Sequence, residues 1–285
     1  MNADDARKNL GVREYKRNLL DNSDFTNPIN QRGQSDYSFD SGYTIDRWKL
    51  HWTGDGSLCI NDGYISLGRI DYSAYLFQNI PMEMGIMGKI VTVAAKVRGK
   101  GVVGFCFNDG TTREGTSFDS DEWQIITKTI TVPYYSYSNT TLNGVELSTH
   151  LDSTIDVEWA ALYEGEYTAE TLPPYIPKGY GAELAECQRY YVPFDYGWLT
   201  ADHPYGDAVG VTVTVPVQMR TSPTVILNGN CEYFDNSANA WATATVGAVR
   251  HNIGGMYKIL IELPNLSTYN GTYLVRNIAA LSADL

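Results

Sequence analysis

The sequence predicts an all-β protein, and two observations carry this prediction. Apolar and polar residues alternate with a period of two over several segments, which is typical of strands that have one face on a core and one in water. Turns rich in Gly, Asn, Asp and Pro, such as Asn61-Asp62-Gly63 and Asn108-Asp109-Gly110, separate these segments. Many short strands with regular turns indicate an antiparallel sandwich or barrel.

The alternation is clearest in two segments. Residues 154–165 place Ile155, Val157 and Trp159 on one face, and residues 209–217 place a valine at every second position. Further strands are expected at 57–60, 64–69, 74–80, 88–97, 102–108, 123–132, 223–228, 241–249, 256–263 and 272–280.

Two segments break the pattern and set the expected domain boundaries. Residues 1–18 are polar and charged, which predicts a partly helical attachment arm that docks on something else. Residues 168–191 hold three prolines between Leu172 and Pro177, followed by a helical stretch at 181–191, and predict a stiff linker with a short helix. The remaining segments, 19–167 and 192–285, are expected to be two β-sandwich domains.

Charge excludes several classes of partner. The chain has 33 acidic and 21 basic residues, for a net charge of −12 and a pI of about 4.7. Nucleic acids and anionic membrane surfaces are bound largely through Lys and Arg, so neither is an expected partner. No apolar run reaches the roughly 20 residues of a membrane span, and the first residues lack the apolar core of a secretory signal. We therefore expect synthesis in a cytoplasm.

The sequence contains no recognisable catalytic or metal-binding motif. It contains no nucleophile elbow, phosphate loop or His-Glu-x-x-His motif, and its four histidines lie far apart. The four cysteines have no metal-binding spacing and are expected to be small core residues. Asp156 and Glu158 alternate with apolar residues, so we expect them on a solvated sheet face, with a catalytic carboxylate pair as the minor alternative. We expect no enzyme activity, no cofactor and no metal.

Aromatic rings in polar loops are the remaining candidates for a binding site. Rings beside amides and carboxylates suit sugars, because a pyranose face stacks on the ring and its hydroxyls find polar partners. The alternative is that most of these rings belong to the core or rim of a sandwich. The rings that we predict to bind glycan are Tyr72, Tyr75, Tyr205, Tyr233 and Trp241.

An ordered set of short motifs resembles a known family. The segments are 18–25 (NLLDNSDF), 31–33 (QRG), 43–48 (YTIDRW), 78–80 (QNI), 88–92 (GKIVT), Trp123, 130–133 (ITVP), 156–165, 183–191 (ELAECQRYY) and 216–225 (PVQMRTSPTV). In this order they resemble bacteriophage tail-fibre and receptor-binding proteins that contain a jelly roll similar to carbohydrate-binding modules.

The residues in these motifs are of a kind that supports a scaffold. Phe25 and Trp48 are large enough to fill the ends of a sandwich, and the pairs Gln31-Arg32 and Asp46-Arg47 can hydrogen-bond the entering chain. The related modules often hold calcium through an acidic residue after the equivalent of Phe25. Thr26 stands there in this chain, so no calcium is expected.

The resemblance implies a virion component with residues 19–167 as the module similar to carbohydrate-binding jelly rolls. It also implies a homotrimer that attaches to other virion proteins through residues 1–18. The expected function is attachment to host-surface glycan without catalysis. A purely structural head fibre, capsid decoration or baseplate component is the first alternative. A polysaccharide depolymerase is the second, although no long β-helix repeat is visible.

Overall fold

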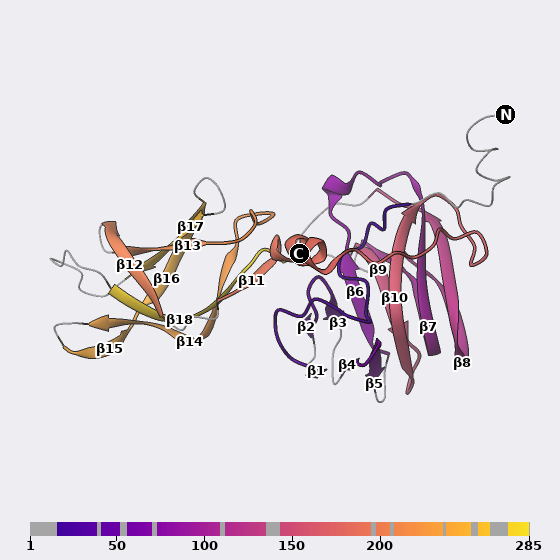
Figure 1. Cartoon of the computed structure of the whole chain (residues 1–285), viewed down its shortest axis with the longest axis horizontal. Coiled ribbons are helices and arrows are strands. Elements are labelled where there is room, and N and C mark those ends of the chain that lie inside the picture. The colour runs from indigo at the N-terminus through magenta and orange to yellow at the C-terminus, as the bar shows by residue number, and fades with distance from the viewer. Residues whose placement is uncertain are drawn as a thin grey trace. The chain divides into compact units, whose positions relative to one another are not determined.

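A computed structural model of the chain describes residues 16–38, 41–51, 56–69, 73–108, 112–134, 143–194, 198–205, 208–235, 238–251, 256–262 and 273–284. Over these ranges the chain is built from antiparallel strands, with one short 3-10 helix at Met82–Met84 and one α-helix, α2 (Tyr180–Gln188) (Figure 1). The prediction of an all-β protein is confirmed. No helix in this part of the chain is both long and apolar enough to cross a membrane.

The described chain forms two compact units that divide between Glu183 and Leu184, inside helix α2. The expected arm at residues 1–18 lies almost wholly outside the described residues. Its last residue, Asn18, is buried: its side chain donates to the Ala160 carbonyl and accepts from the Leu162 N–H. Asn18 is thus hydrogen-bonded into the first unit.

The first unit contains a single hydrogen-bonded sheet that folds into two layers. Its strand order is β1-β4-β5-β10-β7-β9-β6-β3-β2, with β8 paired to β7. The strands are β1 (Asp36–Ser38), β2 (Ser41–Tyr43), β3 (Lys49–His51), β4 (Gly56–Asn61), β5 (Tyr64–Arg69), β6 (Tyr75–Asn79), β7 (Ile90–Phe107), β8 (Thr112–Thr131), β9 (Gly144–Thr149) and β10 (Thr154–Glu164).

The long strand β7 joins the layers. Its first half pairs with β10, its second half pairs with β9, and β8 follows it on the other side. We call β1, β4, β5, β10 and the first half of β7 layer 1, and β2, β3, β6, β9 and the second half of β7 layer 2. At the bend, a Cβ on Gly99 would collide with the Thr154 carbonyl, and one on Gly101 with the Ser148 carbonyl. Glycine is required there because the two layers approach the bend so closely.

The core between the layers contains the scaffold residues expected from the sequence. Phe25 and Trp48 are fully buried with ring centroids 5.2 Å apart, and the Trp48 Nε1–H donates to the Asn22 carbonyl at 2.8 Å. Asp46 accepts from the Gln31 backbone N–H at 2.7 Å and pairs with Arg32 at 3.2 Å. The expected scaffold packing of Phe25 and Trp48 and the expected polar contacts of Gln31, Arg32 and Asp46 are confirmed.

The proline-rich segment is packed against the first unit. Leu172 and Tyr175 cover the outer side of layer 1, where the Tyr175 ring stacks on Trp159 at 4.6 Å. The Lys178 ammonium then donates to the Leu20 carbonyl at 2.9 Å and to Asp21 Oδ1 at 3.0 Å. Burial raises the pKa of Asp21, but Arg47 and Lys178 outweigh it, so the pKa is lowered and Asp21 stays ionised.

Lys178→Met is expected to lower the free energy of unfolding by about 1–3 kcal/mol, because it leaves a buried carboxylate and a carbonyl without their charged donor. Lys100→Met is the matched control. It removes an ion pair with Asp119 in which both side chains are more than half exposed, and such pairs are worth about 0–1 kcal/mol. Urea denaturation of both variants measures the difference, and equal losses would contradict the described packing of the linker.

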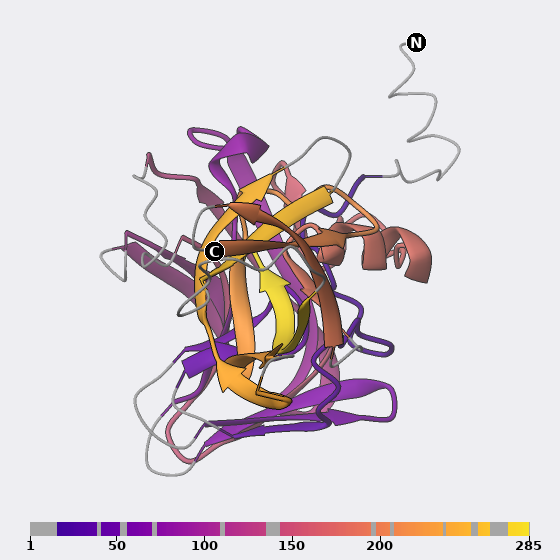
Figure 2. The ribbon, with the colours of Figure 1, turned by 90° about the vertical axis from the view of Figure 1, so that its left-hand side faces the viewer.

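The second unit is an eight-stranded antiparallel sheet that curls around its own core (Figure 2). Its order is β15-β14-β18-β12-β13-β17-β16, with β11 paired to β18. The strands are β11 (Tyr191–Pro193), β12 (Trp198–Tyr205), β13 (Ala208–Thr214), β14 (Thr224–Asp235), β15 (Ala240–Thr243), β16 (Thr245–His251), β17 (Met256–Glu262) and β18 (Tyr273–Ser282). Val211, Val213 and Val215 are buried, as their alternation predicts.

Candidate functional site

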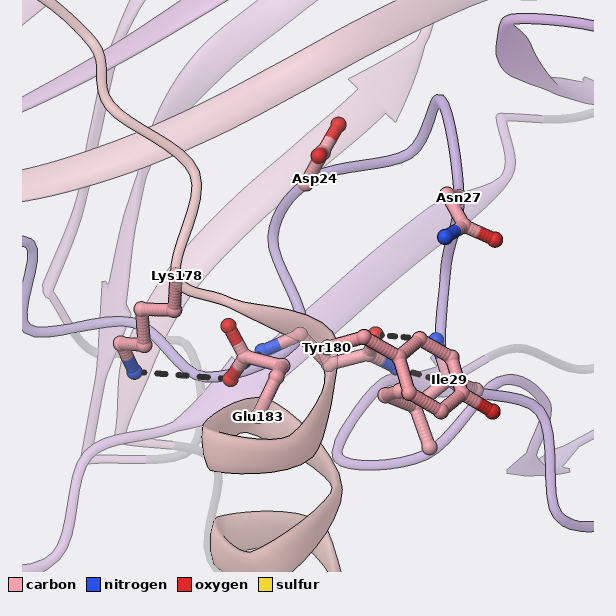
Figure 3. A pocket seen from close by; sticks show the side chains of 7 residues that line it. Asp24, Asn27, Ile29, Lys178, Tyr180 and Glu183 are labelled. Carbon is pink, nitrogen blue, oxygen red and sulfur yellow. Dashed lines mark hydrogen bonds and ion pairs between the residues drawn. The ribbon is translucent and has the colours of Figure 1, made fainter.

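A small pocket lies where the linker meets the N-terminal segment of the first unit. Asn22, Asp24, Lys178, Tyr180 and Glu183 are among its lining residues (Figure 3). Glu183 accepts from the Asn22 N–H at 2.6 Å and from Lys178 at 3.4 Å, so these polar groups are used within the protein. The volume of about 40 Å³ is far below the roughly 300–1,000 Å³ of ligand pockets. The side chains that line the pocket hold the linker against the N-terminal segment, and the pocket itself is too small for a sugar.

The rings predicted to bind glycan fall in different environments. Tyr72 lies outside the described residues, and only the backbone of Tyr205, at the end of β12, is described. Tyr233 is 7% exposed and packs in the core of the second unit, so its ring supports the fold. Tyr75 on β6 and Trp241 on β15 are partly exposed, but they belong to different units.

Among the described residues that lie on strands, one arrangement recurs three times: an arginine lies over an aromatic ring and pairs with a carboxylate. The ring-to-guanidinium distances run from 4.1 to 5.2 Å, and the ion pairs from 2.6 to 3.0 Å. The sets are Tyr75, Arg113 and Glu146; Tyr64, Trp123, Arg98 and Asp156; and Trp241, Arg276 and Glu232. In each set, the ring, the arginine and the carboxylate are all carried by strands.

The first set lies on the outer side of layer 2, which we call the layer-2 face. Strand register places Lys49, Phe77, Glu146, Gly104 and Gly115 in one row across β3, β6, β9, β7 and β8. The residues next to them along the strands point into the core, so this row points outward. The next outward-pointing row on either side of it contains Tyr75 paired with Ser148, and Cys106 paired with Arg113.

Arg113 extends across this face from one strand to another. It starts on β8, directly opposite Cys106 of β7, yet its Nη2 lies 3.0 Å from Oε2 of Glu146 on β9. Its guanidinium lies 4.7 Å from the centre of the Tyr75 ring on β6. Gly104 of β7 is directly opposite Glu146, and a Cβ on Gly104 would collide with the Glu114 carbonyl of β8, so glycine is required where β8 passes. The result is a ring and a guanidinium held together by three strands.

Burial dominates the electrostatics of Glu146. Its side chain is 5% exposed, and burial raises the pKa of its carboxyl to about 7, only partly offset by Arg113 and Ser148. Arg113 is different, because 44% of its side chain is exposed. The positively charged Arg113 side chain is therefore accessible to solvent, whereas the Glu146 carboxylate is not.

The second set lies on the outer side of layer 1. The Arg98 guanidinium lies 5.2 Å from the Tyr64 ring centre and 4.8 Å from that of Trp123, and it pairs with Asp156 at 2.8 Å. Asp156 also accepts from the Ser66 hydroxyl at 2.6 Å. The expectation that Asp156 and Glu158 lie on a partly solvated outer face is confirmed, since Glu158 is also partly exposed and pairs with Lys96.

The third set lies in the second unit. Trp241 of β15 is opposite Phe234 of β14 with ring centroids 5.4 Å apart, and Arg276 lies over the Trp241 ring at 4.1 Å. Arg276 pairs with Glu232 at 2.6 Å. Strand parity explains why Trp241 is available and Tyr233 is not: Tyr233 lies next to Phe234 in β14, so the two side chains point to opposite faces.

Sequence reasoning missed Arg113 and Glu146 as site residues, and it placed Trp123 only in a family motif. Alternation around Glu146 in 144–149 was the available signal, but this segment was not among the expected strands. Arg113 gave no signal because β8 begins at Thr112, well before the strand expected at 123–132.

The described residues show no group of three or more His, Cys, Asp and Glu side chains that could hold a metal ion. Asp156, the acidic residue on the last strand of the first unit, is paired with Arg98. Cys106, Cys187 and Cys231 are buried thiols outside any disulfide, as expected of small core residues, and Cys59 is a half-buried thiol.

Comparisons with known proteins give only distant likenesses. No protein-family model matches the sequence, and no curated protein matches it. A family 29 carbohydrate-binding module from Piromyces equi is 15% identical, with 47% of this chain and 95% of that one covered and a TM-score of 0.33. A tandem CBM22 domain of Xyn10C from Paenibacillus barcinonensis is 10% identical, with 95% and 99% covered and a TM-score of 0.29. The binding domain of botulinum neurotoxin serotype D is 10% identical, with 90% and 80% covered and a TM-score of 0.28. Similarity this low establishes no function for the chain.

Proposed function

We propose that this chain is a non-catalytic saccharide-binding protein of a bacteriophage virion, a tail-fibre or receptor-binding protein that attaches to glycan on the host surface. The observation that carries the saccharide-binding part is the layer-2 face, where a partly exposed Tyr75 and an Arg113 whose side chain is 44% exposed lie together on strands. The virion part rests on the ordered motifs between Asn18 and Val225.

The chemistry of the layer-2 face suits recognition of a sugar. The Tyr75 ring offers an apolar surface to a pyranose face, and Arg113 offers N–H donors to its oxygen atoms. Strands hold both groups, so little conformational freedom is lost when a ligand binds. A homotrimer would present three copies of the face and convert weak single-site binding into firm adhesion. In this proposal, residues 1–18 attach the chain to other virion proteins.

A second candidate is a purely structural virion component, such as a head fibre, capsid decoration or baseplate component. It is favoured by one observation: in all three ring–arginine–carboxylate sets, the arginine is already paired within the protein. Such sets can stabilise a sheet surface without any ligand. A glycan array separates the two candidates, because a structural component should give no reproducible signal.

Tyr75→Ala is expected to weaken saccharide binding about tenfold or more, which corresponds to about 1.4 kcal/mol, because the stacking surface is lost. Affinity is measured by calorimetry on a saccharide that the array identifies. Tyr134→Ala is the matched control, since it removes a tyrosine ring that is 82% exposed and lies outside the layer-2 face. Thermal unfolding of both variants checks that they are folded.

Two results would contradict the proposal: a wild-type protein that binds no saccharide, or a Tyr75→Ala variant that binds as tightly as the wild type. Release of reducing ends from a bound polysaccharide would instead indicate the depolymerase alternative.

A further inference from the structure

The charge of the layer-2 face differs in sign from that of the whole chain. Among the described side chains that β3, β6, β7, β8 and β9 place on it, the charged ones are Lys49, Arg113, Glu146 and, at the bend of β7, the ion pair of Lys100 and Asp119. Three positive groups and two negative groups give +1, against −12 for the chain. When Glu146 is protonated, the face carries +2. An anionic ligand is therefore attracted to this face, whereas the net charge of the whole chain repels it.

The two partners of the central ion pair are unequally accessible. Arg113 is 44% exposed and Glu146 is 5% exposed. The Arg113 guanidinium lies 4.7 Å from the centre of the Tyr75 ring, so an incoming group that meets Arg113 also meets Tyr75. A guanidinium has five N–H donors in a planar fork and binds a carboxylate or phosphate through two parallel hydrogen bonds.

We propose that the layer-2 face binds an anionic saccharide, whose carboxylate or phosphate group pairs with Arg113 while a sugar ring lies on Tyr75; this rests on the saccharide-binding function proposed above. Glu146 is a positioning residue that competes with the ligand anion for the same guanidinium. Protonation of Glu146 removes this competition, so the ligand binds together with a proton.

The surroundings of Glu146 determine its response to pH. The groups that face it are Arg113 from β8, Cys106 from β7, Tyr75 from β6 and, across Phe77, Lys49 from β3. Of these, Arg113 is the charged group in contact with the carboxylate. Burial raises the pKa of Glu146 to about 7. If the ligand requires the protonated form, the apparent affinity falls about tenfold between pH 6 and pH 8.

The test compares anionic saccharides with uncharged counterparts of the same sugar. Oligogalacturonate and its methyl ester form the carboxylate pair, and a phosphorylated mannan oligosaccharide and its dephosphorylated form make the phosphate pair. Calorimetric titration of the full chain at pH 6 and pH 8, in two buffers of different ionisation enthalpy, gives affinity and proton uptake. We expect at least one anionic probe to bind about tenfold more tightly than its counterpart at pH 6, with proton uptake and a tenfold loss at pH 8.

Two variants separate this mechanism from general charge attraction. Glu146→Gln is expected to bind the anionic probe at pH 8 as the wild type does at pH 6, without proton uptake. Arg113→Gln is expected to lose the preference for the anionic probe and to keep binding to the uncharged one. Thermal unfolding shows that both variants are folded.

The outcomes distinguish the two proposals. If the wild type binds anionic and uncharged probes equally, or if Glu146→Gln keeps the pH dependence, the inference of an anionic ligand is wrong and the proposed saccharide-binding function stands. If none of the four probes binds and the glycan array is also blank, both are wrong.

Discussion

Replacing Trp48 with alanine is expected to lower the free energy of unfolding by about 3–5 kcal/mol, as is typical when a fully buried tryptophan is removed. Trp48 is 0% exposed, its ring meets Phe25 edge to face, and its Nε1–H satisfies the Asn22 carbonyl. The variant loses this packing and leaves a buried carbonyl without its donor. Urea denaturation measures the loss.

Trp123→Ala is the matched control for this prediction. Trp123 lies on the outer side of layer 1, is partly exposed and contacts Arg98 and Tyr64. Its removal is expected to cost about 1 kcal/mol or less, since it fills no enclosed space. If the two variants lose the same stability, the core described around Trp48 is wrong.

The stability of the wild type is expected to fall by about 3 kcal/mol between pH 4.5 and pH 7.5 because of Glu146. Burial raises the pKa of Glu146 from 4.5 to about 7, so in this window the folded protein keeps a proton that the unfolded chain has released. Stability is therefore greatest at the low end of the window and declines as the pH rises. A difference of about 2.5 pKa units at 1.36 kcal/mol each gives the magnitude.

Glu146→Gln tests this prediction, because glutamine cannot ionise. Urea midpoints at pH 5 and pH 8 should differ much less in this variant than in the wild type. A residual slope of the same sign remains, since burial also raises the pKa of Glu183. Arg113→Gln should move the loss to higher pH, because it removes the cation that lowers the pKa of Glu146. Equal slopes in the wild type and Glu146→Gln would show that Glu146 is solvated in the folded protein.

Strand alternation identified much of the fold from the sequence. Residues 154–164 and 208–214 form strands close to the expected ranges. The expectation that Trp159 shares a face with Ile155 and Val157 is wrong, because a bulge after Val157 turns Trp159 to the outer side of layer 1.

The bend in β7 was not predictable from the local sequence pattern. Two glycines so close together, Gly99 and Gly101, are typical of a turn, so the sequence predicts two strands, at 88–97 and 102–108. In the structure one strand runs through both, because β8 pairs with it along its whole length.

The candidate site was harder to predict than the fold. Neighbouring residues of a strand point to opposite faces, so a shift of one position along the strand decides whether a ring is buried or exposed. Tyr233 is buried, whereas Trp241 lies opposite Phe234, the next residue of β14, and is on the other face. Alternation in 144–149 indicates that Glu146 points away from the core, but it does not indicate that Glu146 is buried, because this strand is buried on both faces. Burial raises the pKa of Glu146, and its neighbours across the sheet, Phe77 and Gly104, lie far away in the sequence.

The most direct measurement of whether the layer-2 face recognises saccharide is a crystal structure of the chain with a bound oligosaccharide. We predict a sugar ring in van der Waals contact with Tyr75 and an anionic substituent within hydrogen-bonding distance of Arg113. A saccharide bound only beside Tyr64 and Trp123, or only beside Trp241, would contradict the assignment of the site to layer 2.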